Sequence, residues 1–425
     1  MVNIDNAIFP ALSIISAHLS KFEPFPFPAG FDIQKVASAA QSLPEHSWEF
    51  GSAAQALLEL HNPELSVFGA QPFPVPSISN LTSVPALKYA ADSVKFGASY
   101  HALAKGDGAA GDPPSLGVSA VMLGKTDARF AKAADETVGG LFNDVPRFAN
   151  GAISHRADVP ELWADWMYMV PPFLAYYAVD KGDQALLQET INQITLYRQV
   201  LSPNPTASSS KGLWMHIIGP QSQDTGHWST GNAWAAAGMT RVLATVMKSD
   251  NKSTNADFRR STATLLTGYI KEIVDGAMQA PLDHGLLRNY IDNVDNWDGT
   301  GFGEVSGSSL FAATIYRMAV LQPTVFDAKY ITWADGLRMA VATGKDVNGR
   351  PHITAEGIAT PAVNPMWWKD TKPFTTGSPE GQAFVVLMYA GWRDCVKAEK
   401  CSSASTSEEK VDAVVNKRAL HRRHF

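Results

Sequence analysis

The sequence predicts an all-α fold, specifically an (α/α)6 barrel, in which an outer ring of helices surrounds an inner ring. Three observations lead to this prediction. The 425 residues repeat an amphipathic helical pattern about a dozen times, with Gly, Pro and Asn between the repeats. Strand patterns are few. No residue-level repeat typical of an open solenoid is visible, so a closed double ring fits better.

The apolar spacing predicts a helix in each segment that lies between two such breaks. These segments are 32–42, 47–62, 84–103, 114–123, 127–144, 160–180, 183–201, 230–247, 256–279, 304–321, 326–344 and 378–395. The best strand candidates are "GLWMHIIG" at 212–219 and "GLLRNYID" at 285–292. We expect residues 1–396 to form one catalytic domain and residues 397–425 to form a polar and basic tail.

The composition narrows the classes of partner. The chain is 45% hydrophobic and 18% charged, with a formal net charge of −6, so nothing favours a nucleic-acid partner. No apolar run approaches the roughly 20 residues that span a bilayer, so we expect no membrane partner. The long connections are rich in Trp, His, Asn and Asp, which favours a small-molecule site built on loops. The oligomeric state is left open.

The sequons and the cysteine pair favour an extracellular protein whose signal peptide is absent from this chain, with a cytoplasmic location as the alternative. Asn80-Leu-Thr and Asn251-Lys-Ser match the acceptor pattern for N-glycosylation. The only cysteines, Cys395 and Cys401, lie close enough in sequence to close a small disulfide loop. The first residues lack the basic region of a signal peptide, as they would if a cleaved signal had been replaced by Met.

One acid stands alone in the stretch "LWADWMYMVPPFLAYYAV" at 162–179. Pro160 suits the first turn of a helix that begins just before Asp165, and the adjacent Pro171 and Pro172 should bend or end that helix. Asp165 is either a buried residue bonded to a loop or an acid for proton transfer. In the second case, we expect apolar surroundings to raise its pKa.

A second stretch, "HWSTGNAWAAAG" at 227–238, sets Trp228 and Trp234 beside Asn232. Aromatic rings next to polar groups suit a sugar, because its C–H faces stack while its hydroxyls form hydrogen bonds. Ordinary packing at the start of a helix is the alternative, and His216 is likewise either structural or functional. The chain has no zinc-type His/Glu spacing and no phosphate loop, so we expect neither a metal nor a cofactor.

The order of these motifs resembles the unsaturated glycuronyl hydrolases of glycoside hydrolase families 88 and 105. Their rhamnogalacturonyl members carry a Trp-x-Asp-x-(Leu/Met)-(Phe/Tyr)-Met helix, a Gly-Leu-x-x-His segment and a Trp-x-Arg-Gly-Asn-x-Trp segment. This chain has "LWADWMYM", "GLWMH" and "HWSTGNAW" in the same order, and "SWEFG" with Trp48 is similar to their early Trp-x-Tyr-x-x-Gly helix. "EVSGSSLFAATIYRMA" and "FTTGSPEGQAFVVLMYAG" are similar to their later barrel helices.

The resemblance implies an (α/α)6 barrel that releases a 4,5-unsaturated uronic acid from the non-reducing end of lyase-generated oligosaccharides. Hydration of the C4=C5 double bond would need one acid that then serves as base, and Asp165 matches that acid. Asp112 lies near the place of the family's second Asp, although it is equally explained as a helix cap. Trp48, His216, Trp228, Asn232 and Trp234 would bind the sugar.

One position departs from the family pattern. Thr230 stands where the relatives have an Arg, a residue suited to binding a sugar carboxylate. Arg288 or His216 would have to compensate. Two other functions stay open: a two-carboxylate exo-glycosidase that uses Glu304 or Asp295 as its second acid, and a non-catalytic sugar-binding protein.

Overall fold

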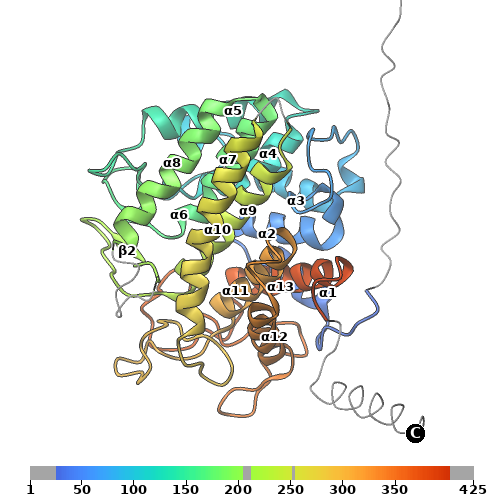
Figure 1. The fold of residues 1–425 in the computed structure, drawn as a ribbon, viewed down its shortest axis with the longest axis vertical. Coiled ribbons are helices and arrows are strands. Elements are labelled where there is room, and N and C mark those ends of the chain that lie inside the picture. The colour runs from blue at the N-terminus through green and yellow to red at the C-terminus, as the bar shows by residue number, and fades with distance from the viewer. Residues whose placement is uncertain (1–24, 204–211, 251–253, 403–425) are drawn as a thin grey trace, which may run out of the picture.

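The computed structural model describes residues 25–203, 212–250 and 254–402 (Figure 1). Its longer α-helices follow one another with few strands between them. They are α1 (Ile33–Ser42), α2 (Ser47–His61), α3 (Pro85–Ser93), α4 (Gly117–Leu123), α5 (Ala128–Asn143), α6 (Trp166–Met169), α7 (Pro171–Lys181), α8 (Gln184–Leu201), α9 (Ser229–Lys248), α10 (Ala256–Met278), α11 (Val305–Leu321), α12 (Ala328–Thr343) and α13 (Pro379–Lys397). The short strands β1 (Leu162–Trp163) and β2 (Ile217–Ile218) pair antiparallel.

The helices form two concentric rings. In the inner ring α2, α4, α7, α9, α11 and α13 pack in that order, and α13 closes the ring against α2. The outer helices α3, α5, α8, α10 and α12 each pack against an inner helix next to them in sequence, and α1 covers α13 and α2. Figure 1 shows α8, α10 and α12 running along the outside of the molecule. The predicted (α/α)6 barrel is confirmed.

Burial separates the rings. Every residue of α9 from Ser229 to Val246 is buried, whereas α10 buries only a stripe along one face. A small residue also lets α6 approach α9 closely: a Cβ on Gly238 would lie 1.9 Å from the Met167 carbonyl oxygen. The uninterrupted burial of α9 therefore marks an inner helix, and the amphipathic pattern in α10 marks an outer one.

Two predicted helices differ from the structure. The helix expected over 84–103 ends at Ser93, because the chain turns back and the Lys95 amide donates to the Leu103 carbonyl. The helix expected over 160–180 starts only at Trp166, because residues 162–163 pair with β2 instead. Pro160 therefore does not occupy the first turn of a helix.

Other local predictions are confirmed. Pro171 and Pro172 interrupt the expected helix: α6 ends at Met169 and α7 begins at Pro171. The candidate strand at 212–219 contains β2. The stretch 285–292 contributes single bridges, such as Arg288 with Gly303, and is not a strand in the described ranges.

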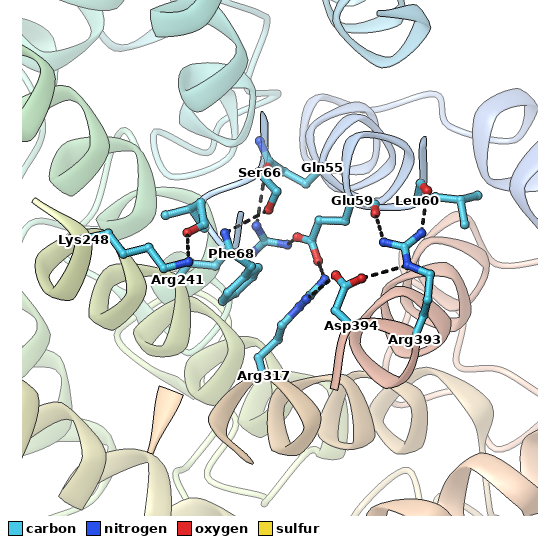
Figure 2. Close-up of polar contacts among 11 residues, drawn as sticks. Gln55, Glu59, Leu60, Ser66, Phe68, Arg241, Lys248, Arg317, Arg393 and Asp394 are labelled. Carbon is cyan, nitrogen blue, oxygen red and sulfur yellow. Dashed lines mark hydrogen bonds and ion pairs between the residues drawn. The ribbon is translucent and has the colours of Figure 1, made fainter. Parts of the chain in front are cut away.

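The end of the barrel where the inner helices finish is held by buried charges (Figure 2). Glu59 of α2 binds Arg241 of α9 and Arg317 of α11, and Arg317 Nη1 also donates to Asp394 of α13 at 2.6 Å. Glu59, Arg241 and Arg317 are each at most 7% exposed. One carboxylate thus ties three inner helices together at this end. None of the helices in the described ranges is long and apolar enough to cross a membrane.

A disulfide links the chain that follows α13 to the last turn of this helix. Cys395 and Cys401 form a disulfide, as their spacing allowed. Most of the predicted tail, residues 403–425, lies outside the described residues, as does the sequon at Asn251. The boundary at residue 396 stays a prediction.

Candidate active site

The opposite end of the barrel, where the inner helices begin, holds a cleft with a cavity volume of about 260 Å³. Its wall contains three carboxyl groups that each lie at the start of a helix. Asp112 precedes the 3-10 helix η4 (Pro113–Leu116), Asp165 precedes α6 and Glu380 lies in the first turn of α13. Because inner helices begin at the same end, residues far apart in sequence share one wall.

Asp165 is placed by the pairing of β1 with β2. The Ala164 amide donates to the His216 carbonyl, so the residue after β1 faces the histidine before β2. His216 Nε2 lies 3.2 Å from Asp165 Oδ2, and His216 Nδ1 lies 3.0 Å from Asp224 Oδ2. Burial alone would lower the pKa of His216, but Asp165 and Asp224 outweigh it and raise that pKa. His216 thus lies between two carboxyl groups, and both favour its protonated form.

Asp112 lies in a different environment. Its side chain makes no capping hydrogen bond, so the helix-cap explanation is not supported. Burial, with a contribution from the nearby Asp165 charge, raises the pKa of Asp112 to about 8. His155 Nε2 lies 3.5 Å away, and burial lowers the pKa of His155 to about 3. At neutral pH the contact therefore joins a protonated carboxyl and a neutral imidazole, not an ion pair.

Glu380 was not found by sequence reasoning. Trp48 Nε1 donates to its Oε1 at 2.8 Å, and its buried Oε2 has no hydrogen-bond partner in the described part of the chain. Burial, and next the Asp165 charge, raises the pKa of Glu380 well above its ordinary value. A signal was present: Glu380 is the only acid in the apolar start of "PEGQAFVVLMYAGW", just as Asp165 stands alone in its own stretch.

Tryptophans form the side walls of the cleft. Trp163, Trp228 and Trp368 line it together with Trp48. Asn289 holds two of them, because it accepts from Trp228 Nε1 at 2.7 Å and donates to the Trp368 carbonyl at 3.0 Å. Trp163 lies in β1 and Trp48 in the first turn of α2, whereas Trp228, Asn289 and Trp368 come from the loops before α9, α11 and α13.

Arg156 is the only Lys or Arg among the described residues that line the cleft. Its guanidinium lies over Gly108, where a Cβ would be 2.4 Å from Arg156 Nη2, and Gly108 has a φ of +91°. Its charge reaches Asp112, whose pKa it lowers against the larger effect of burial. Gly108 thus adopts a positive φ that the turn needs, and its lack of a side chain leaves room for the Arg156 guanidinium.

The structure brings only some of the sequence-predicted residues to the cleft. Asp112, Asp165, Trp48 and Trp228 line it, and His216 lies behind Asp165. Thr230 and Trp234 are fully buried within α9 and do not line it.

The side chains of two further predicted residues form hydrogen bonds with backbone groups and do not line the cleft. Asn232 exchanges hydrogen bonds with the Trp214 backbone and donates to the Trp228 carbonyl, so it positions Trp228. Arg288 does not reach the cleft to replace the family Arg, because its guanidinium donates to the Gly301 carbonyl at 2.6 Å.

The acids considered for an ordinary glycosidase are also placed elsewhere. Glu304 is buried at the start of α11, where it accepts from Ser229 and from the Ser306 and Gly307 amides. Asp295 is exposed and does not line the cleft. Within the described ranges, no group of three His, Cys, Asp or Glu side chains is arranged to hold a metal ion.

Comparison with known proteins identifies the family and supports the fold. The family model described as Glycosyl Hydrolase Family 88 matches residues 121–364. No curated protein matches the chain.

Several solved structures share the fold. A possible member of the GH105 family from Klebsiella pneumoniae is 13% identical with a TM-score of 0.63, covering 92% of this chain and 99% of that one. An unsaturated glucuronyl hydrolase from Bacillus sp. GL1, responsible for the degradation of glycosaminoglycan, is 13% identical with a TM-score of 0.54, covering 83% and 93%. A GH76A α-1,6-mannanase from Salegentibacter sp. is 12% identical with a TM-score of 0.52, covering 85% and 98%.

Proposed function

This chain belongs to glycoside hydrolase family 88, and we propose on that premise that it releases a 4,5-unsaturated uronic acid from the non-reducing end of lyase-generated oligosaccharides. One observation carries the proposal: a protonated Asp112 lies in the same cleft as Asp165, and Arg156 supplies a positive charge there. Such a cleft offers a proton for a double bond and a cation for a carboxylate. An unsaturated uronic acid presents both groups on one ring.

The reaction adds water across the C4=C5 bond. The carboxyl pair Asp112 and Asp165 protonates C4, which leaves an oxocarbenium-like cation centred on C5. Water adds to C5 and gives its proton to the same pair, so the pair regains its starting protonation. The resulting C5 hemiketal opens, and the aglycone leaves from C1. Unlike an ordinary glycosidase, the enzyme does not attack the glycosidic carbon directly.

The pair needs two different environments, and the cleft supplies them. Burial keeps a proton on Asp112 at neutral pH, while His216, whose pKa is raised, faces Asp165. The charge on Asp165 is one reason that Asp112 holds its proton. We propose that this pair donates the proton to C4 and accepts the proton from water.

Arg156 is the proposed partner of the substrate carboxylate. Neither Thr230 nor Arg288 lines the cleft, so they cannot contact a sugar there without rearrangement. A half-buried guanidinium next to Asp112 would hold the carboxylate close to the carbon that is protonated. That Thr230 marks an altered specificity stays a prediction, and Thr230→Arg assayed against unsaturated glucuronyl and galacturonyl disaccharides tests it.

A second candidate is an ordinary exo-glycosidase, which is favoured by Glu380, a further buried carboxyl group with a raised pKa on the same wall. The two candidates are separated by one measurement. Hydration removes the ultraviolet absorbance of the conjugated C4=C5 bond, whereas ordinary hydrolysis releases sugar with the absorbance intact.

The test uses a panel of disaccharides produced by pectin and glycosaminoglycan lyases. We expect the absorbance to fall as the aglycone appears. Sugar release without loss of absorbance would overturn the proposal in favour of the glycosidase, and binding without release would identify a sugar-binding protein.

Secretion stays a prediction. Two features support it: Asn80 of the first sequon is exposed, and Cys395 is bonded to Cys401.

A further inference from the structure

A second cavity, of about 530 Å³, opens beside the cleft and has no part in the proposed mechanism. Asp224, Tyr290, Trp297, Asp298, Lys369 and Thr371 are among the residues that line it. Two loops build most of its wall, at 290–300 and 369–371. They touch each other, because a Cβ on Gly299 would lie 2.8 Å from Thr371 Cβ.

The second cavity and the cleft share a wall. The segment 365–371 gives Pro365, Met366 and Trp368 to the cleft, and Lys369 and Thr371 to the second cavity. His216 spans the same wall, with Asp165 on its cleft side and Asp224 on the other. A chain of sugars that leaves the cleft across this segment would therefore meet the second cavity.

Large aromatic side chains are exposed along that path. Trp297 is 81% exposed in the wall of the second cavity, and Trp367, in the segment that contributes residues to both cavities, is 63% exposed. Exposed tryptophans next to polar cavities are typical of sugar binding, because the ring stacks on the C–H face of a sugar while polar groups take its hydroxyls.

The charge of the second cavity selects the kind of sugar. Burial alone would raise the pKa of Asp224, but hydrogen bonds from His216 and Tyr290 outweigh it and lower that pKa to about 2. Hydrogen bonds from Thr300 and Asn293 likewise lower the pKa of Asp298 against its burial. Asp292 adds a third carboxyl group, 2.7 Å from His227 Nδ1, and Lys369 is the only Lys or Arg among the described lining residues, 3.7 Å from Asp224. Such a surface repels a second uronate or a sulfate.

We propose that this second cavity is a distal subsite that binds a neutral, hydroxyl-rich sugar of the aglycone, with Trp297 as its stacking platform. The proposal rests on the proposed function, since it places the unsaturated uronate in the cleft. The enzyme would then favour oligosaccharides longer than a disaccharide, with neutral sugars beyond the cleavage point.

The test compares Trp297→Ala with the unchanged protein on an unsaturated disaccharide and on a longer oligosaccharide that carries neutral sugars. We expect kcat/KM for the longer substrate to fall about tenfold, through KM, while the disaccharide is unaffected. Trp297→Phe keeps an aromatic platform and should restore most of the loss. Val347→Ala is the matched control, because Val347 is 74% exposed and lines neither cavity.

The outcomes separate this inference from the proposed function. Equal activity of Trp297→Ala and the unchanged protein on both lengths, or an equal loss on both, would overturn the distal subsite and leave the reaction standing. If no unsaturated substrate is turned over, the distal subsite is tested instead by calorimetry, which measures binding of a saturated neutral oligosaccharide to the unchanged protein and to Trp297→Ala. Binding that weakens in Trp297→Ala supports the subsite, and no binding to the unchanged protein refutes it.

Discussion

Asp112 and Asp165 show how neighbours set the chemistry of one residue type. Asp112 is buried beside a neutral His155, so its carboxyl keeps a proton near neutral pH. Asp165 faces His216, whose pKa Asp165 and Asp224 raise against the effect of burial. The two aspartates therefore differ because their surroundings differ, although each lies beside a histidine.

Asp165→Asn is expected to lower kcat by roughly a thousandfold or more while the protein stays folded. An amide has nearly the same shape as the carboxyl but cannot take part in the two proton transfers. The measurement is loss of ultraviolet absorbance at saturating substrate, with the circular dichroism spectrum as the check on folding. Near-normal turnover in the folded variant would remove Asp165 from the mechanism.

The activity should have an alkaline limit set by Asp112. Its pKa of about 8 lies above the ordinary value, so the proton that the reaction needs is present below that pH and is lost above it. We expect kcat/KM to fall by about tenfold per pH unit on the alkaline side. Because the Arg156 charge lowers the pKa of Asp112, Arg156→Gln should move this limit to higher pH. An unmoved limit would assign it to another group.

Arg156→Gln should also weaken binding of the uronate. A charged hydrogen bond to a carboxylate contributes about 1.5–3 kcal/mol, so KM is expected to rise by on the order of ten- to a hundredfold. Initial rates over a range of disaccharide concentrations measure this. Arg129→Gln is the control, because Arg129 is exposed and does not line the cleft. A KM equal to that of the control would mean that another group holds the carboxylate.

At the scale of elements, the two ends of the inner helices do different work. At one end, Asp112 and Asp165 lie just before η4 and α6, which lead into α4 and α7, and Glu380 lies in the first turn of α13. The C-terminal halves of α2, α9, α11 and α13 carry the ion pairs of Figure 2. The helices α2, α9 and α13, which carry Trp48, Trp228 and Glu380 at the cleft, are therefore joined to one another away from it.

Glu59→Gln should destabilise the barrel without touching the cleft. It leaves Arg241 and Arg317 buried with one carboxylate fewer, and breaking a buried ion pair costs about 3–5 kcal/mol. Thermal unfolding measures the loss. Lys88→Ala breaks the exposed pair with Asp92 and should cost less than about 1 kcal/mol. Equal melting temperatures for both variants would contradict a structural role for the network.

At the scale of the whole molecule, we expect the reaction to proceed without a metal ion. The proposed steps need only the carboxyl pair, His216 and Arg156, and the cleft lining has no zinc-type ligand set among its described residues. Assays after dialysis against EDTA should retain full activity. Activity that vanished on chelation and returned with one added metal would refute this expectation.

The sequence by itself determined the fold class, because helical periodicity and the lack of strand patterns are local properties. It also identified Asp165, since a lone acid in an apolar stretch is visible without coordinates, and resemblance pointed to Asp112. It missed Glu380 and Arg156, and it gave Asn232 and Arg288 roles that their hydrogen bonds to backbone do not support.

Only the tertiary structure decided which residues share the cleft. Asp112, Asp165 and Glu380 come from starts of inner helices that are far apart in sequence, and ring closure of α13 on α2 brings the last of them to Trp48. The structure also decided their protonation, because the pKa of Asp112 depends on burial and on the Asp165 charge beside it. Burial and charge proximity arise from contacts between distant segments, so no local pattern encodes them.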